Sequence, residues 1–259
     1  ADIGTYADDA DLTYTDKPSK SDLESDLNGY TFGTVTVYVD GTSTGAPTVT
    51  DIDSLRTVLD NGKLVEVYAD DTNEINRVVI INTYLARAES DYDTEDKKLS
   101  IEIYGSAGSV TLDNDYFAVS SYLEDDYLLV TASTNDRTWT VRSVAPATVV
   151  KDGTVNSYRN GDYVTVNGTQ YKYNATAKAA SSGALGQSLM TSGGYSLGEG
   201  YNVYLDSYGY AIGVEGYTSS IDLSNYVFIT DADKSGFEYI AKAVFMDGTS
   251  KTITVDKTA

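Results

Sequence analysis

Residues 62–81 read GKLVEVYADDTNEINRVVII, and residues 200–217 read GYNVYLDSYGYAIGVEGY. In both stretches an alternating run of apolar and polar residues ends in Val-Tyr-x-Asp, a polar turn follows, and a second apolar run returns. Alternation with a period of two on both sides of a short turn predicts a β-hairpin with one face toward a core.

The two stretches are related by a constant offset of 136 residues. It holds for four pairs of residues: Val67 and Val203, Tyr68 and Tyr204, Asp70 and Asp206, and Val78 and Val214. A lone hairpin buries too little surface to be stable, and an internal repeat indicates a repeated structural unit. We therefore predict two related β-domains.

The chain has 259 residues, enough for one large domain or two ordinary ones, and 41% of them are hydrophobic. We predict an all-β protein with two tandem, related antiparallel β-barrel or β-sandwich domains and one or two short helices. The predicted parts are a lead-in arm at residues 1–29, a first β-domain at residues 30–150 and a second at residues 151–259. The lead-in could add an edge strand or act as an ordered arm.

Two local patterns place elements in the first predicted domain. A short helix is expected to begin at Asp51 or Asp53 and to stop at Asn61-Gly62. Residues 77–88 contain no breaker, so we expect one long strand that serves two neighbours.

In the second predicted domain, Asn167-Gly168 indicates a tight hairpin, because these residues tolerate positive φ. Residues 174–200 are rich in Ala, Ser and Gly and are predicted to form mainly a long loop, with one helical turn at 184–190.

The charge of the chain is strongly negative: 39 Asp and Glu against 18 Lys and Arg give a formal net charge of −21. Such a field repels phosphate backbones and anionic lipids, so we expect neither nucleic-acid nor membrane-surface binding. No apolar run reaches the roughly 18–20 residues that span a bilayer. The first residues, ADIG, contain no charged start or apolar core, so we expect any export signal to have been removed or to lie outside this sequence.

The sequence contains no Cys and no His. Disulfides, thiolate nucleophiles, Ser-His-Asp catalysis and most transition-metal sites are therefore excluded. Two carboxylates roughly 5–10 Å apart could form a glycosidase pair, but nothing singles out one pair among 39 acidic residues. We predict no catalytic residue and no enzyme activity, and a carboxylate-only enzyme is the third hypothesis.

Tyrosine dominates the aromatic residues, with 23 Tyr against 5 Phe and 1 Trp. A packed ring with a hydrated hydroxyl suits half-buried strand faces. Exposed tyrosines could instead stack on sugar rings and make the chain a carbohydrate-binding module. The single indole, Trp139, lies in a strand pattern and is expected to pack in a core.

The residues Asp231-x-Asp233-x-Ser235-Gly236 begin like a calcium loop, with oxygen ligands at alternate positions. The twelfth position is Lys242 in place of Glu, and no helices flank it, so an EF-hand is not expected. A looser calcium site at these residues and an ordinary acidic loop are both left open. No other cofactor or metal is predicted.

Three pairs of adjacent aspartates fall at predicted turns: Asp8-Asp9, Asp70-Asp71 and Asp125-Asp126. Asp is preferred in turns because its side chain accepts backbone hydrogen bonds, so we interpret these pairs as turn residues and not as metal ligands.

Two segments match the acceptor motif for N-glycosylation, Asn167-Gly168-Thr169 and Asn174-Ala175-Thr176. The turn explains the first, and nothing beyond the motif supports the second.

Six stretches resemble one family, and they occur in the expected order. They are IGTYADDADLTYTDK (3–17), VEVYADDTNEINRVVIINTYLA (65–86), DYVTVNGTQYKYNA (162–175), YNVYLDSYGYAIGVEGY (201–217), NYVFITDAD (225–233) and AVFMDGTSKTITV (243–255). Together they resemble the non-anchor, β-rich region of large bacterial cell-surface proteins that carry S-layer homology domains.

The resemblance implies an extracellular protein of the cell wall or S-layer. In that family the S-layer homology modules bind wall polysaccharide, while regions like this one project outward. No helical repeat of that kind occurs in these 259 residues, so wall anchoring would belong to modules outside them. The implied partners are copies of the same chain or other surface-layer proteins, and the family supplies no catalytic motif.

These observations favour a non-catalytic structural segment that acts as a rigid projecting scaffold with self-assembly or lateral contacts. Assembly by strand addition could use the lead-in arm or an exposed sheet edge. The alternative is a carbohydrate-binding or adhesin module on the cell surface, for which a groove lined by several tyrosines would be evidence.

Overall fold

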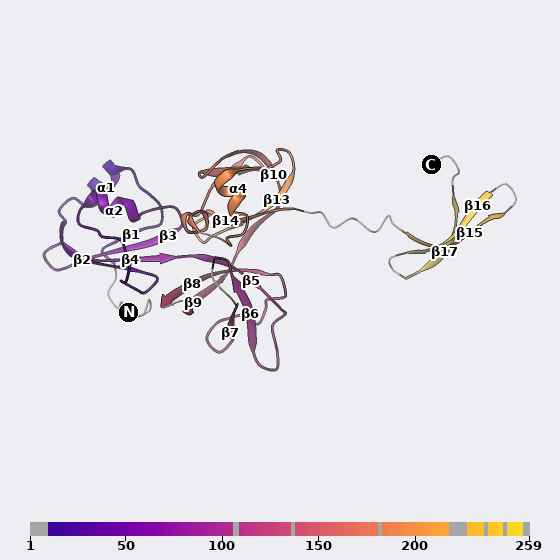
Figure 1. Ribbon diagram of the computed structural model, residues 1–259, viewed down its shortest axis with the longest axis horizontal. Helices are drawn as coiled ribbons and strands as arrows, with labels where there is room; N and C mark the ends of the chain where they lie inside the picture. Colours follow the sequence, from indigo (N-terminus) through magenta and orange to yellow (C-terminus); the bar gives the residue numbers. More distant parts are fainter. Residues whose placement is uncertain are drawn as a thin grey trace. The chain divides into compact units, whose positions relative to one another are not determined.

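The computed structural model describes residues 10–105, 109–135, 138–180, 183–217, 227–235, 238–245 and 248–255 (Figure 1). The chain divides into two compact units, Ala1–Tyr217 and Thr218–Ala259. Strands dominate both units, and the described residues of the first unit also contain four short helices, more than the one or two expected. The predicted all-β fold class is confirmed.

The first unit consists of three modules with one sheet each in the described residues, which we call module A (residues 10–82), module B (84–146) and module C (148–217). Module A contains β1 (Leu12–Tyr14), α1 (Lys20–Asp26), β2 (Thr31–Val39), α2 (Ile52–Val58), β3 (Lys63–Ala69) and β4 (Glu74–Asn82). Module B contains β5 (Tyr84–Ala88), β6 (Lys98–Ile103), β7 (Ser109–Asp113), β8 (Tyr127–Asn135) and β9 (Thr138–Pro146). Module C contains β10 (Thr148–Arg159), β11 (Tyr163–Val166), β12 (Thr169–Lys172), α3 (Ala175–Ala179), α4 (Gln187–Ser192), β13 (Gly200–Leu205) and β14 (Ala211–Gly216).

The sheet of module A departs from the antiparallel prediction in one strand. Its order is β1-β3-β4-β2, and β2 runs parallel to β4. Parallel neighbours need a crossover connection, and here the chain crosses over through α2 and β3. Both helices of module A contribute to the core on this sheet, which buries Leu23, Leu27 and Leu55.

The predicted lead-in arm is part of module A wherever the structure describes it. Strand β1 pairs with β3 at the sheet edge, and α1 follows directly. Tyr14, Leu23 and Leu27 are all buried in the module core. Residues 10–29 therefore add an edge strand and a helix to the first sheet, and they are not a separate arm.

Helix α2 begins where the sequence predicts and ends earlier. The Asp51 carboxylate accepts a hydrogen bond from the Ser54 amide at 2.7 Å, and the Ser54 hydroxyl accepts one from the Asp51 amide at 3.0 Å, which completes a capping box. The C-cap is Leu59 in extended backbone, not Asn61-Gly62. Leu59 is fully buried, so packing in the core favours this early exit.

The two repeated stretches form the same kind of hairpin, as predicted. β3 pairs with β4 and β13 pairs with β14, both in antiparallel register. Val67 faces Val78 in module A, and Val203 faces Val214 in module C. Each ladder shifts register directly after the tyrosine of the Val-Tyr-x-Asp motif. The sequence repeat is therefore a structural repeat at the level of the hairpin.

The turn that closes each hairpin also repeats. The side chains of Asp70 and Asp206 each accept hydrogen bonds from the amides two and four residues later. Three residues after the aspartate, φ is positive: 61° at Asn73 and 85° at Gly209. Glycine and asparagine are the residues that adopt this left-handed conformation most readily.

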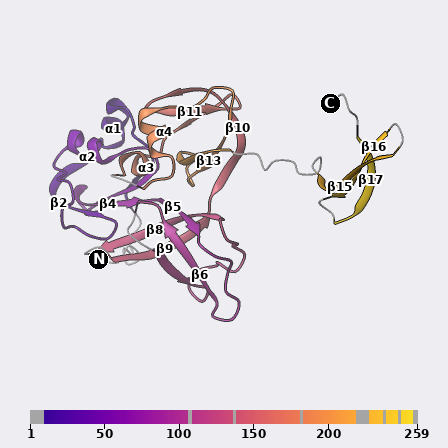
Figure 2. The ribbon, with the colours of Figure 1, turned by 45° about the vertical axis from the view of Figure 1, so that its right-hand side comes forward.

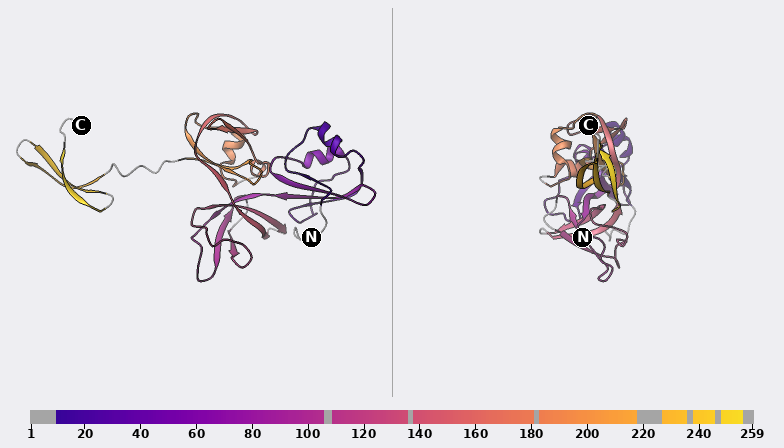
Figure 3. Two further views of the ribbon diagram at one scale, coloured as in Figure 1. Left: turned by 180° about the vertical axis from the view of Figure 1, so that it is seen from behind. Right: turned by 90° about the vertical axis from the view of Figure 1, so that its right-hand side faces the viewer.

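Successive modules are joined almost without linkers. Only Thr83 separates β4 from β5, and only Ala147 separates β9 from β10. Residues 77–88, predicted as one long strand, thus run through two strands of neighbouring sheets (Figure 3). Strands β4 and β8 of modules A and B are also in contact (Figure 2). The predicted domain boundary after residue 150 falls inside β10.

Module C contains the predicted tight hairpin and two helices where a long loop was expected. Asn167 and Gly168 join β11 to β12 with φ values of 50° and 80°. Within residues 174–200 the chain forms α3 and α4, and the Asn174 side chain caps α3 by accepting from the Ala177 amide. None of the helices in the described ranges is long and apolar enough to cross a membrane.

The second unit contains β15 (Val227–Ser235), β16 (Glu238–Phe245) and β17 (Ser250–Val255), in the order β15-β16-β17. All its pairs are antiparallel. The second predicted domain, residues 151–259, therefore extends over most of module C and the whole of this second unit.

The equivalent turn positions give a prediction about stability. Replacing Gly209 by Val should cost about 1–2 kcal/mol, because a β-branched residue at φ 85° is strained. The matched variant Asn73→Gly should be nearly neutral, since glycine adopts the same φ without strain. Urea unfolding followed by circular dichroism measures both, and equal losses in the two variants would contradict the equivalence.

Candidate functional site

A cavity of about 350 Å³ opens where the three modules of the first unit meet. Module A contributes Lys63 and Asn82, and module C contributes Thr176 and Ile212 among others. The full lining consists of Lys63, Asn82, Thr83, Tyr84, Leu85, Tyr104, Gly105, Trp139, Thr176, Ala177, Ala179, Ala180, Ala184 and Ile212. The end of β4 and the start of β5 line this cavity together with α3, which contributes Thr176 and Ala177.

Module B supplies an aromatic wall to this cavity. The rings of Tyr84 and Trp139 meet edge to face with centroids 4.7 Å apart, and Tyr104 also lines the cavity. Trp139 is half-buried and packs against the module B core, as the strand pattern predicted, but it also borders the open space. The sequence interpretation of Trp139 was therefore correct and incomplete.

The polar side of the cavity rests on a buried carboxylate. Asp40 is 3% exposed and accepts hydrogen bonds from the Asn82 amide and side chain, both at 2.9 Å, and from the Tyr84 hydroxyl at 2.6 Å. The Thr176 hydroxyl donates to Asn82 Oδ1 at 2.8 Å. This network joins modules A, B and C through side chains.

Burial determines the proton affinities in this network. Desolvation raises the pKa of the Asp40 carboxyl, and the hydrogen bonds from Asn82 and Tyr84 oppose that rise. Burial also raises the pKa of the Tyr84 hydroxyl, and the neighbouring Asp40 charge adds to it. Tyr84 therefore keeps its proton and acts as a donor to Asp40.

The cavity presents groups that can contact a small molecule. Its lining offers aromatic rings, an amide, hydroxyls and the Lys63 ammonium. The Asp40 carboxylate is occupied by Asn82 and Tyr84, and among the described residues no Asp or Glu lines the cavity. Rings combined with hydrogen-bonding groups suit a small hydroxyl-rich molecule such as a sugar.

A second buried network fastens module A to module C. Asn174, which is fully buried, donates from Nδ2 to Asp206 Oδ2 at 2.7 Å and to the Gly62 carbonyl at 3.4 Å. The Ala175 amide donates to the Asn61 carbonyl at 2.8 Å. A Cβ on Gly62 would collide with both Asn174 and Asp206, so this close approach requires glycine.

The two equivalent turn aspartates differ in environment. Asp206 is 4% exposed, and burial raises its pKa against the opposing hydrogen bonds from Asn174 and backbone amides. Asp70 is exposed, and hydrogen bonds from the Thr72 hydroxyl and from the Glu74 and Thr72 amides lower its pKa. One turn sequence therefore serves as a surface turn in module A and as part of an interface in module C.

The two acidic pairs that the structure describes, Asp70-Asp71 and Asp125-Asp126, lie in different modules. Asp8-Asp9 lie outside the described residues. Asp125 and Asp126 line a second hollow, of about 600 Å³, where modules B and C meet. There Asp126 accepts from the Leu123 amide at 2.8 Å, as expected for a turn residue.

Strand β15 contains the residues predicted to begin a calcium loop, Asp231, Asp233 and Ser235. The prediction that these residues form a loop is therefore wrong. Asp231 faces Lys242 across the ladder, and Asp233 faces Ile240. In the described parts of the chain no three Asp, Glu, His or Cys side chains gather into a metal-binding group. Extended pairing with β16 is the reason that these residues do not form a compact loop.

The two glycosylation motifs have different settings. The side chain of Asn167 accepts from the Thr154 amide of the neighbouring strand β10, at 2.9 Å. Asn174 is inaccessible in the folded protein because its amide is buried against Gly62 and Asp206. The structure excludes the second motif as a modification site of the folded chain.

Sequence reasoning missed the networks around Asp40 and Asn174. The polar residues Asn82 and Thr83 interrupt an otherwise apolar stretch, and this was the one local signal of a buried polar site. Asp40 and Asn174 look like ordinary turn and cap residues from the sequence. Their role depends on contacts 42 and 112 residues away in the chain.

Comparison with known proteins adds little. No family model matches the chain, and no curated protein matches it. One solved structure, described as Drosophila Unr CSD456, matches at 12% identity with a TM-score of 0.21, over 67% of this chain and 82% of that one. A similarity at this level supports no argument about this protein.

The paired aspartates predict opposite titrations. In a ¹³C carboxyl NMR titration, Asp70 should titrate below the reference pKa of 3.8 and Asp206 above it. Between 3.8 and the folded-state pKa of Asp206, the folded chain holds the proton more tightly than the unfolded one, so the Asp206 contribution to stability falls as pH rises. The Asp70 contribution is present above 3.8 and is lost as pH falls through its folded-state pKa.

The variants Asp70→Asn and Asp206→Asn assign the two signals in that titration. Coincident midpoints for both residues would show that the burial difference has no electrostatic effect.

Proposed function

We propose that this chain is a non-catalytic structural segment of a bacterial cell-surface or S-layer-type protein, in which the first unit acts as a rigid projecting scaffold. The observation that carries the proposal is the fastening of modules A, B and C by buried hydrogen bonds across single-residue joints. Thr83 and Ala147 leave no flexible linker between the three sheets. Tyr84 of module B donates to Asp40 of module A, and Thr176 of module C donates to Asn82 of module A. Asn174 of module C also donates to the Gly62 carbonyl of module A.

The energetics of these contacts support rigidity. A buried polar group that loses its partner costs about 1–3 kcal/mol. Any hinge motion between modules A and C would break the contacts of Asn174 with Gly62 and of Thr176 with Asn82. Modules B and C also share a hydrophobic cluster that includes Leu85 and Leu129 from module B.

The cell-surface setting rests on the six stretches that resemble proteins with S-layer homology domains. An acidic chain without Cys is suited to an extracellular scaffold that needs solubility and no redox-sensitive bonds. Extracellular location, contacts with copies of the same chain, and wall anchoring through modules outside these residues belong to this proposal. Catalysis does not.

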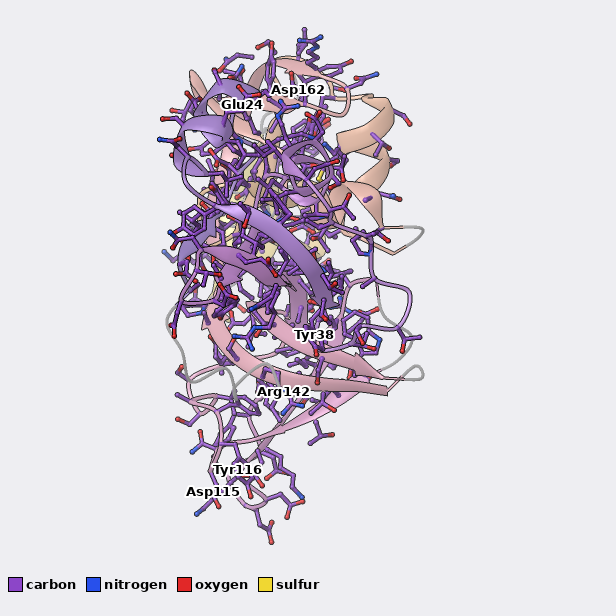
Figure 4. The ribbon with its side chains drawn as sticks, turned by 90° about the vertical axis from the view of Figure 1, so that its left-hand side faces the viewer. Glu24, Tyr38, Asp115, Tyr116, Arg142 and Asp162 are labelled. Atoms are coloured by element: carbon purple, nitrogen blue, oxygen red, sulfur yellow. The ribbon has the colours of Figure 1, made fainter. Side chains whose placement is uncertain are left out.

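Rigidity can be measured by pulsed electron spin resonance, because the chain has no native Cys to interfere with labelling. Spin labels at Glu24→Cys in module A and Asp162→Cys in module C, both marked in Figure 4, should give one narrow distance distribution. Adding Asn174→Ala should broaden it and lower the free energy of unfolding by about 2–3 kcal/mol, through the lost cap and the unpaired Asp206.

The matched control is Asn160→Ala, because the exposed Asn160 side chain donates to the Ser192 carbonyl within module C. This variant should leave the distance distribution unchanged. It should alter the free energy of unfolding by no more than about 0.5 kcal/mol. A broad distribution in the unmodified chain would overturn the scaffold proposal.

The aromatic cavity favours a second candidate function, a carbohydrate-binding module. Its support is the wall formed by Tyr84, Tyr104 and Trp139 beside the polar groups of Asn82 and Lys63. Two of the three rings in this wall are tyrosines. The same unit could combine a rigid frame with one small binding site.

A glycan array followed by calorimetry tests this second function. If a glycan binds in the cavity, Trp139→Ala should weaken binding at least about tenfold, or 1.4 kcal/mol, while the fold stays intact by circular dichroism. The aromatic control is Tyr116→Ala: Tyr116 is 82% exposed at the tip of module B and does not line the cavity (Figure 4). Equal affinity in both variants would exclude the cavity as the binding site.

A further inference from the structure

The second unit has the same strand topology as the first half of module B. Strands β5, β6 and β7 are three consecutive antiparallel neighbours, and so are β15, β16 and β17. Each set follows one of the two repeated hairpins, β3–β4 before β5 and β13–β14 before β15. The order of hairpin and three-stranded sheet therefore occurs twice in the chain.

The two sheets differ at the outer edge of their first strand. In module B, β8 occupies that edge of β5, with Ala86 opposite Leu128 and Tyr84 opposite Val130. In the part of the second unit that the structure describes, β15 is an edge strand and has only β16 as a neighbour. Unpaired N–H and C=O groups on a strand edge are ready to pair with another strand.

In the described part of the second unit, Ala241 and Ala243 of β16 are buried, but other apolar side chains are exposed that have buried counterparts in module B. Ile101, Ile103 and Leu112 of module B are at most 2% exposed. In the second unit, Ile229 is 45% exposed and Val255 is 43% exposed. These exposed apolar side chains leave surface that an added strand could remove from water.

We propose that the outer edge of β15 accepts a β-hairpin of the β8–β9 kind, which pairs antiparallel with β15 and lays alternating apolar side chains over the exposed face. Strand addition of this kind takes its affinity from main-chain hydrogen bonds and its specificity from alternate side chains. Module B contains an example of this pairing, because β8 pairs with the edge of β5 and β9 pairs with β8.

Charge favours this occupant over a second copy of the unit. Strand β15 carries Asp231, Asp233 and Lys234, a net charge of −1 (one Lys less two Asp), on a chain with net charge −21. Residues 127–146, the β8–β9 hairpin, contain Asp136, Arg137 and Arg142, a net charge of +1 (two Arg less one Asp). Pairing two β15 edges would instead bring like charges together.

A peptide with the sequence of residues 127–146, added to the full chain, tests the proposal by hydrogen exchange. The amides of β15 should exchange at least about tenfold more slowly with the peptide, because formerly unpaired groups become hydrogen-bonded. The control peptide carries Leu128→Asp and Val130→Asp, which removes the apolar alternation and should give no protection. Ile229→Lys in the full chain, at an exposed position, should abolish the effect without altering the fold.

A second arm appends residues 127–146 to the C-terminus through a flexible Gly-Ser linker, which raises the effective concentration of the hairpin. No slowing at β15 in either arm would overturn the proposal. So would slowing without peptide that grows with protein concentration, which would identify a second copy as the occupant. Protection confined to module B would also overturn it, since the peptide would then be replacing β8–β9. The inference is independent of the rigidity proposed for the first unit, and the spin-label distances there should not change.

Discussion

The first unit depends on the buried side chain of Asn174 in module C, which donates to Asp206 of the same module and to the Gly62 carbonyl of module A. Three residues meet there. Asp206 is a buried turn aspartate, Asn174 caps α3 and also reaches module A, and Gly62 has no side chain that would block the contact. The geometry works only because Gly62 leaves room for both polar groups. In this way local features of three separate segments become a single tertiary constraint.

The repeated hairpins show how one sequence pattern takes on two roles. Register, bulge position and turn hydrogen bonds are the same around Asp70 and Asp206. What differs is the packing around the turn: Asp70 is exposed to solvent, and Asp206 is buried beside Asn174 and Gly62. Its pKa rises because burial outweighs the hydrogen bonds it receives. The surroundings, and not the motif, decide the electrostatics.

Sequence patterns predicted the local structure well, because hairpin periodicity, the Asp51 cap and the Asn167-Gly168 turn are determined by neighbouring residues. They did not predict the division of the chain. The parallel pairing of β2 with β4 and the inclusion of residues 10–29 in module A depend on contacts between distant segments. The site around Asp40 was missed for the same reason, while Trp139 was placed in its core but not beside the cavity. Asp231 and Asp233 have the sequence spacing of calcium ligands. They lie in an extended strand because β15 pairs with β16.

Thr83 and Ala147 also limit how such a chain can evolve. Side chains alternate between the two faces of a strand, so a joint of one residue fixes which face each following residue presents. Gaining or losing a single residue at either joint would invert the inward and outward positions of the strand that follows. Recombination between related genes can therefore exchange whole modules only where it keeps the number of residues in each joint. The length of the joints is then inherited together with the order of the modules.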